Sequence, residues 1–244
     1  MYAVLGGIYG ALLSVMNLFN AQLSAVYGNW GSTVMIHAVG LLVLLPLAFT
    51  WGRPKAPAPW YLYGGGLIGI VTVMCCNLAI GGIGVTANLV IMLLGQLTCS
   101  TLIDQFGLFG ARQVKLSAAR LVSLLVIAAG DLVMLLWAGS SAGEGNTSTL
   151  LAVLTSFLSG FSMVFARISN ARLAEKSGLG FSTVMNYVTG LAGSFLIFAC
   201  MGLHLETAFP APGQSITIYL GGAMGALAIF LCNMVTPKLS TLQF

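Results

Sequence analysis

Several polar side chains lie within long apolar stretches of this sequence, at spacings that would align them on helices. Asn17, with Asn20 beside it, belongs to a stripe of small and polar residues in the first stretch. Arg167 and Asn170 take the matching places in a later stretch. Polar groups are costly in hydrocarbon, so they usually face a bundle interior or a water-filled cavity. The stripes therefore predict the wall of a transport pathway. The alternative is that they only join helices, through hydrogen bonds worth about 1 kcal/mol each.

Two further side chains could carry protons. His37 lies about a third of the way into the second apolar stretch, and histidine titrates near neutral pH. Asp131 lies about four turns into the fifth stretch, where an acid removed from water is a plausible proton carrier for coupled export. The alternative for His37 is a buried, hydrogen-bonded side chain. For Asp131 it is an acid that reaches the external interface or bonds to a neighbouring helix.

The remaining pathway candidates are amides. Gln96 lies in the middle of the fourth stretch, and Asn77 and Asn233 form a symmetric pair in two others. Each could line a pathway or join neighbouring helices. The full set of candidates for the pathway is Asn17, Asn20, His37, Asn77, Gln96, Asp131, Asn170, Asn186 and Asn233.

Asp104 and Arg167 are expected close to the cytoplasmic ends of their stretches. Charged side chains at such places extend toward the lipid headgroups. For Asp104 this predicts a structural or gating role at a helix end. Arg167 would either gate the pathway there or help to fix the orientation in the membrane.

The composition places these residues in a membrane protein. Of 244 residues, 58% are hydrophobic and 6% are charged, against about 25% charged in soluble domains. This excludes a soluble protein, and the scattered Lys and Arg residues exclude a nucleic-acid binder. The five cysteines lie in apolar runs without the spacing of metal ligands, so neither a metal nor another cofactor is expected. Because hydrolase and protease motifs are also missing, we expect no enzyme.

The apolar stretches predict an all-α integral membrane fold with about eight transmembrane helices. A helix needs roughly 20 apolar residues to cross the bilayer. The qualifying stretches cover approximately residues 3–25, 32–50, 62–80, 84–103, 117–137, 149–170, 181–202 and 216–235. Turns are expected over Tyr27–Gly31 and at Gly81-Gly82.

Charges between the stretches predict the orientation. Eight basic residues fall on one side of the eight-span arrangement: Arg53, Lys55, Arg112, Lys115, Arg120, Arg172, Lys176 and Lys238. Glu144 and Glu206 fall on the other side. By the positive-inside rule the basic side is cytoplasmic, which also places the N-terminus in the cytoplasm.

An internal repeat divides the chain. Residues 10–41 match residues 160–191 at an offset of 150, including Ser32–Met35 against Ser182–Met185 without a gap. From Tyr63 to Asn77 the match continues at an offset of 156. Five spans precede the second copy, so its topology is inverted, as in many secondary transporters. We expect a first five-helix repeat over residues 1–140, an external linker over 141–148, and a second repeat of three helices over 149–244.

The first repeat resembles a known family. The pattern runs from Gly65–Gly69 through Asn77 and Gly95-Gln96 to Ile103–Gly107. It is similar to the YdcZ family of the drug/metabolite transporter superfamily. The resemblance covers the first 140 residues and the three spans of the second copy. It implies a bundle of five-helix units that exports small molecules across the bacterial inner membrane.

The leading hypothesis is therefore a secondary transporter that exports a small metabolite or drug-like molecule by alternating access between inverted repeats. The expected partners are the lipid bilayer and a small-molecule substrate. Because the second repeat contains only three spans, a homo- or hetero-oligomer could supply further helices. The alternative is a truncated, non-transporting membrane subunit or scaffold that needs a partner chain.

Overall fold

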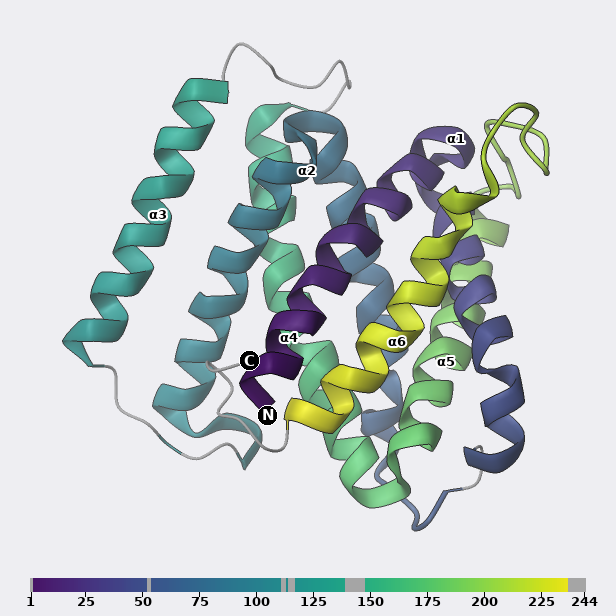
Figure 1. Ribbon diagram of the computed structural model, residues 1–244, viewed down its shortest axis with the longest axis horizontal. Helices are drawn as coiled ribbons and strands as arrows, with labels where there is room; N and C mark the ends of the chain where they lie inside the picture. The colour runs from purple at the N-terminus through teal and green to yellow at the C-terminus, as the bar shows by residue number, and fades with distance from the viewer. Residues whose placement is uncertain (1, 52–53, 111–112, 114–116, 139–147, 237–244) are drawn as a thin grey trace.

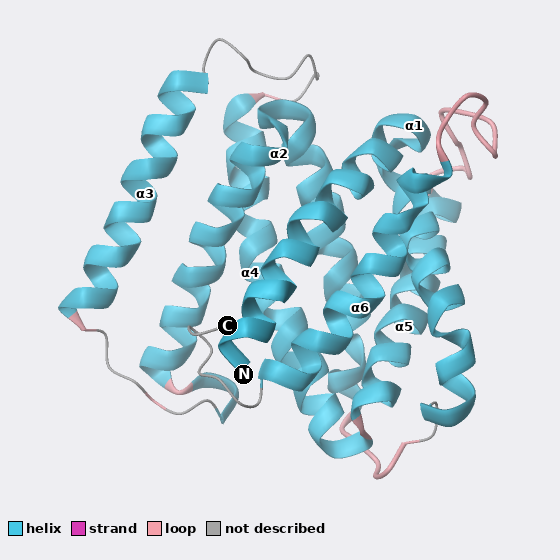
Figure 2. Cartoon of the chain, viewed as in Figure 1, coloured by secondary structure: helices cyan, strands magenta, loops and turns pink. Residues whose placement is uncertain are grey.

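The computed structural model describes residues 2–51, 54–110, 113, 117–138 and 148–236. Within these ranges all regular secondary structure is helical (Figures 1 and 2). The α-helices are α1 (Tyr2–Trp51), α2 (Gly65–Phe106), α3 (Ala118–Ala138), α4 (Thr149–Ser177), α5 (Leu179–Cys200) and α6 (Leu220–Val235). Three short 3-10 helices are η1 (Trp60–Gly64), η2 (Leu108–Gly110) and η3 (Ile216–Tyr219).

Five helical segments are long and apolar enough to cross a membrane. They are Val4–Pro46, Trp60–Phe106, Thr149–Ser177, Leu179–Cys200 and Ile216–Val235. The mean hydropathy of their most apolar windows lies between 1.4 and 2.1. The predicted all-α membrane fold is therefore confirmed.

Helices α1 and α2 each change direction at a glycine. A straight helix of 50 residues such as α1 would be about 75 Å long, more than twice the roughly 30 Å hydrocarbon core. Instead, α1 runs away from the N-terminus and folds back (Figure 1). Gly28 (φ 75°, ψ 166°) and Gly84 (φ 79°, ψ 169°) are the non-helical residues within α1 and α2. Only glycine readily adopts this backbone conformation, which makes these reversals possible without a loop.

The turn predictions were close but not residue-accurate. Gly28 lies inside the predicted turn Tyr27–Gly31, whereas Gly84 follows the predicted Gly81-Gly82 turn by two residues. The linker expected over residues 141–148 lies outside the described residues except for Ser148. The hydroxyl of Ser148 accepts a hydrogen bond from the Leu151 amide at 3.3 Å and so caps the start of α4.

The second half of α2 packs closely along α4. A Cβ added at Gly95 would collide with the carbonyl oxygen of Phe157, and one at Gly160 would collide with that of Met92. Ser156 then donates to the side-chain oxygen of Asn88 at 2.9 Å. Small residues bring the two backbones together, as is usual for helices that pack within membranes.

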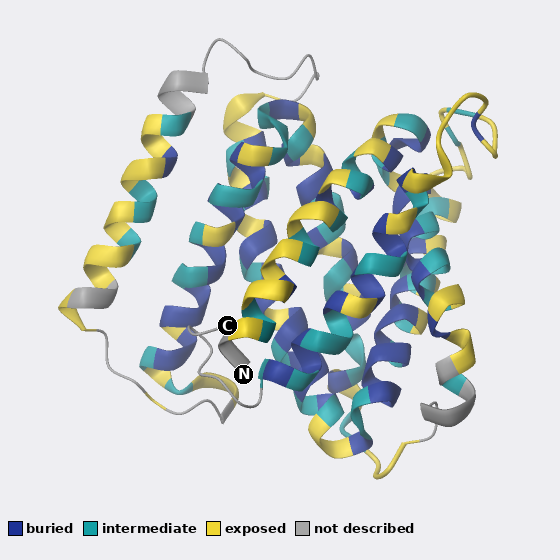
Figure 3. Ribbon diagram, viewed as in Figure 1, coloured by how far each residue is buried: buried dark blue, intermediate teal, exposed yellow. Residues whose placement is uncertain are grey.

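Large apolar side chains cover the outside of the bundle (Figure 3). This is clearest on α3, which stands at the edge of the bundle beside α2 (Figure 1). Val126 is 65% exposed and Val133 is 63% exposed. Such a surface is stable only against lipid, because in water a contiguous apolar surface of this extent would associate.

The close α2–α4 crossing makes a testable prediction about stability. Gly160→Ala forces the backbone of α2 to move, and overpacking of this kind typically costs about 1–3 kcal/mol. Gly10→Ala is the matched control, because nothing lies within 4 Å of a Cβ at that equivalent position. Alanine there should be neutral or slightly stabilising, since it favours the helix by roughly 0.5–1 kcal/mol over glycine.

The measurement is the thermal unfolding midpoint of each variant in a neutral detergent. We expect a lower midpoint for Gly160→Ala and an unchanged or higher one for Gly10→Ala. Equal shifts for the two variants would contradict the close crossing.

Candidate functional site

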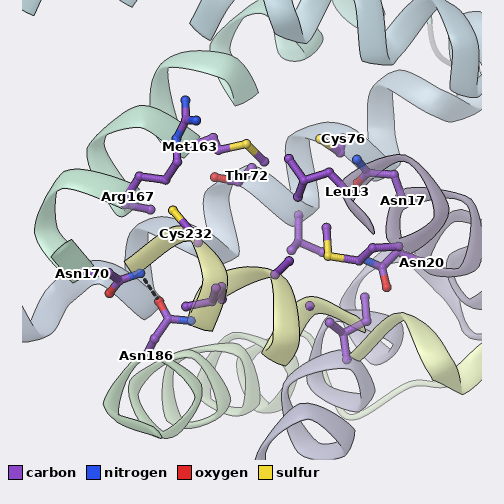
Figure 4. A pocket seen from close by; sticks show the side chains of 18 of the residues that line it. Leu13, Asn17, Asn20, Thr72, Cys76, Met163, Arg167, Asn170, Asn186 and Cys232 are labelled. Carbon is purple, nitrogen blue, oxygen red and sulfur yellow. Dashed lines mark hydrogen bonds between the residues drawn. The ribbon is translucent and has the colours of Figure 1, made fainter. Parts of the chain in front are cut away.

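A cavity of about 110 Å³ lies between α1, α2, α4, α5 and α6 (Figure 4). One buried water needs roughly 10–15 Å³ of cavity volume measured in the same way. The cavity therefore has room for several waters or a small organic molecule. Its lining is mainly apolar and includes Leu13, Met16, Ile36, Val73 and Met163. A few polar side chains interrupt this surface. An apolar pocket with a small number of polar groups is typical of ligand sites.

Arg167 lines the cavity and is 8% exposed. Its Nη2 donates a hydrogen bond to Oε1 of Gln96 at 2.9 Å. The predicted position of Arg167 near a helix end is corrected by the structure. The sequence places the end of this span at about residue 170, but α4 continues to Ser177, ten residues beyond Arg167. The arginine therefore lies within the bundle, well before the end of α4, and its gating role stays a prediction.

An asparagine pair forms one wall of the cavity. Nδ2 of Asn170 on α4 donates to Oδ1 of Asn186 on α5 at 2.8 Å. The hydroxyl of Ser182 donates to the backbone carbonyl of Asn170 at 2.6 Å and further fixes α5 against α4. Both asparagines line the cavity and are 5% exposed, so their bond is shielded from bulk water.

Asn17 and Asn20 on α1 occupy the opposite side of the cavity (Figure 4). They are 4% and 3% exposed. Among the described residues, Nδ2 of Asn17 and Oδ1 of Asn20 have no hydrogen-bond partner. A buried polar group without a partner costs about 1–3 kcal/mol. Both side chains line the cavity, but the two unpartnered atoms have almost no exposed surface, and Oδ1 of Asn20 lies against Gly221 of α6.

His37 and Tyr187 meet at another part of the lining. Their ring centroids are 5.9 Å apart. Nδ1 of His37 lies 2.8 Å from the carbonyl oxygen of Thr33. A carbonyl can only accept, so Nδ1 carries the hydrogen and Nε2 is the nitrogen that can take up a further proton. The geometry is compatible with both roles predicted for His37, a proton relay and a buried, hydrogen-bonded side chain.

Four predicted pathway residues lie outside the cavity lining. Gln96 stands behind Arg167 as its hydrogen-bond partner. Nδ2 of Asn77 donates to Oδ1 of Asn29 at 3.0 Å, and Nδ2 of Asn233 donates to the Thr183 hydroxyl at 3.3 Å. These contacts join helices, which is the alternative that the sequence left open for these amides.

The fourth is Asp131 on α3, a helix that contributes nothing to the lining in the described chain. Asp131 is 4% exposed, and neither carboxylate oxygen has a hydrogen-bond partner among the described residues. Its proposed coupling role stays a prediction. Asp104 is 1% exposed and lies two residues before the end of α2, in keeping with its expected place at a helix end. Its gating role also stays a prediction.

Sequence reasoning missed Tyr9 and Thr72, which both line the cavity. The Thr72 hydroxyl donates to the Ser162 hydroxyl at 2.9 Å and so connects α2 with α4. The available signal was helical register. Tyr9 lies eight residues before Asn17, and Thr72 lies between Gly69 and Cys76 at spacings of three and four, so each shares a face with other lining residues.

Apolar helices packed around a mainly apolar cavity with a few polar groups define an integral membrane protein with a candidate internal binding site. A family model described as "Putative inner membrane exporter, YdcZ" matches residues 1–133 and 151–244. The chain therefore belongs to the YdcZ family of inner membrane exporters, within the drug/metabolite transporter class. A search of curated proteins found no match to the chain.

The Asn170–Asn186 bond can be tested by a double-mutant cycle. We expect the two alanine substitutions to be non-additive, with a coupling free energy of about 0.6 kcal/mol and an upper limit near 1.7 kcal/mol. The measurement is the unfolding free energy of the single and double variants in detergent. Asn20→Ala combined with Asn186→Ala is the control and should be additive, since no hydrogen bond joins those side chains. Additivity in both cycles would contradict the Asn170–Asn186 contact.

Proposed function

We propose that this protein is a secondary transporter that exports a small molecule through the central cavity by alternating access between two inverted repeats. The observation that carries the proposal is the composition of the cavity lining. Residues at equivalent positions of the two repeats line it together, as a substrate site between inverted halves requires.

The pairing extends over nearly the whole lining. Six pairs have the offset of 150 and four have the offset of 156 found in the sequence. The pairs are Leu13 and Met163, Met16 and Ala166, Asn17 and Arg167, Asn20 and Asn170, Ile36 and Asn186, His37 and Tyr187, Gly69 and Gly225, Thr72 and Ala228, Val73 and Ile229, and Cys76 and Cys232. Tyr9 is the lining residue in the described chain whose counterpart, Ser159, is not part of the lining. Such pairing is expected of a cavity that lies on a pseudo-two-fold axis.

The proposed topology has eight membrane spans. Helices α1 and α2 would each cross twice, reversing at Gly28 and Gly84, and α3 to α6 would each cross once. Close contacts at the helix ends support the inverted relation. The Gly28 turn of the first copy lies against Glu206, in a loop of the second copy. Conversely, the Gly178 turn of the second copy lies against the side chain of Lys55, in a loop of the first copy.

The same contacts support a cytoplasmic N-terminus. Lys55 lies beside the turn that ends α4, and Arg172 and Lys176 lie in the last turns of α4. These basic residues gather at one end of the bundle, while Glu206 lies at the Gly28 reversal. By the positive-inside rule the basic end faces the cytoplasm. The first half of α1 starts at that end.

Two clusters at opposite ends of the bundle could act as gates. At the Gly28 end, the Tyr27 hydroxyl contacts that of Tyr219 and accepts a hydrogen bond from the Ala211 amide at 2.8 Å. At the Gly178 end, the Ser177 hydroxyl donates to the carbonyl of Ala56 at 2.8 Å. In each case the last residue before the turn of one repeat contacts a loop of the other repeat. Breaking one cluster while the other stays formed would open the cavity to one side at a time.

Transport is tested in proteoliposomes loaded with a defined mixture of anionic, neutral and cationic metabolites. We expect at least one component to leave faster than from protein-free liposomes, as measured by mass spectrometry. Ala228→Trp should reduce this flux at least tenfold, because the new ring fills the cavity. Leu132→Trp is the control and should retain the flux, since Leu132 is 58% exposed on the lipid-facing side of α3.

Elution of each variant as a single species in detergent serves as the check on folding. A mixture from which nothing leaves faster than the background contradicts the proposed function. So does a folded Ala228→Trp protein with the flux of the unchanged chain.

A further inference from the structure

The lining of the cavity is nearly symmetric in position but not in charge. Arg167 on α4 is the charged residue of the lining, and its repeat counterpart on α1 is the neutral Asn17. Among the described residues that line the cavity there is neither Asp nor Glu. The cavity wall therefore carries a positive charge on the α4 side only.

The guanidinium group of Arg167 is held in place within the bundle. Its Nη2 donates to the amide oxygen of Gln96, which fixes the side chain. Tyr9 and Cys232 line the same cavity as Arg167. A guanidinium presents a planar fork of N–H donors that matches a carboxylate. Such a bidentate, charge-assisted contact is among the strongest that a side chain offers to an anion.

Other polar groups on the same side of the cavity are also suited to bind a carboxylate. Asn170 and Asn186 lie on the Arg167 side of the cavity (Figure 4). Asn17 lies on the opposite side, on α1, so the amides nearest to Arg167 are Asn170 and Asn186. An ionised carboxylate only accepts hydrogen bonds, and these groups offer donors.

The rest of the lining sets the shape of the ligand. Leu13, Met16, Ile36 and Val73 supply most of the apolar surface on the α1 and α2 side, where the polar groups are neutral side chains. The space of about 110 Å³ suits one ring or a short chain rather than a large multiply charged molecule. The two chemistries of the lining together describe an amphipathic ligand with one charged end.

We infer that the cavity binds a small organic monocarboxylate, with its carboxylate on the Arg167 side and its apolar body against the α1 and α2 side. This inference rests on the proposed transport function and gives that function a substrate class. It also gives Arg167 the role of a binding residue instead of a helix-end or topology residue.

The test compares ligands of nearly equal shape and different charge. Benzoate, benzamide and benzylamine are titrated against the full-length chain in nanodiscs of neutral phosphatidylcholine, with empty nanodiscs as background. Hexanoate serves as a second, flexible monocarboxylate. We expect saturable binding of benzoate or hexanoate that is at least tenfold tighter than that of benzamide, and no saturable binding of benzylamine.

Variants then identify the group that recognises the charge. Arg167→Gln should weaken carboxylate binding at least tenfold and leave the weak benzamide binding unchanged, whereas Arg167→Lys should retain part of the preference for an anion. Leu132→Trp, on the lipid-facing side of α3, should bind as the unchanged chain does. If Arg167→Gln does not fold, the charge series on the unchanged chain still decides the question.

Two results would overturn the inference. One is equal or tighter binding of benzamide or benzylamine, which would leave the transporter proposal intact but assign a neutral or cationic substrate. The other is no saturable binding of either carboxylate. Failure of transport itself is detected separately, as the absence of any flux from the mixed-metabolite proteoliposomes.

Discussion

The hydrocarbon of the bilayer offers no hydrogen-bond partner, and the arrangement of this protein follows from that constraint. Polar side chains on apolar helices must face one another or an internal space, because the lipid-facing side cannot satisfy them. Asn170 and Asn186 meet each other, Arg167 meets Gln96, and Asn17 and Asn20 face the cavity. Where helices must also approach closely, glycine removes the side chain, as at Gly95 and Gly160. The polar interior and the apolar exterior are therefore two results of one solvent effect.

The cavity combines symmetry of position with asymmetry of chemistry. Equivalent positions in the two copies place Asn20 opposite Asn170, and His37 beside Tyr187. A pseudo-two-fold arrangement gives a transporter two related conformations of similar energy, one open to each side. Differences such as Asn17 against Arg167 would then suit a symmetric frame to the asymmetric ligand that we propose. In the proposed transporter, the symmetric frame would supply the motion and the substitutions between copies would supply the selectivity.

Much of this arrangement could be predicted from the sequence, because apolar stretches and glycines carry strong one-dimensional signals. The all-α membrane fold follows from composition, and the reversal at Gly28 falls within a turn predicted from Tyr27–Gly31. Arg167 was predicted too close to the end of its helix. Polar residues accumulate after position 167, so the apolar stretch ends before the helix does, and α4 continues to Ser177. Asn77 could not be separated from true lining residues, since the rotation of a helix about its axis is set by packing against neighbours distant in sequence.

If two inverted copies share one cavity, corresponding loops of the two copies must face opposite sides of the membrane. Lys55→Cys and Glu206→Cys place thiols in exposed loops at corresponding places of the two copies. Each variant is labelled with a membrane-impermeant maleimide in right-side-out and in inside-out vesicles, with the unchanged chain as the control for its own cysteines. We expect the thiol at position 206 to react only from the periplasmic side and the thiol at position 55 only from the cytoplasmic side. Labelling of both thiols from the same side would contradict this arrangement.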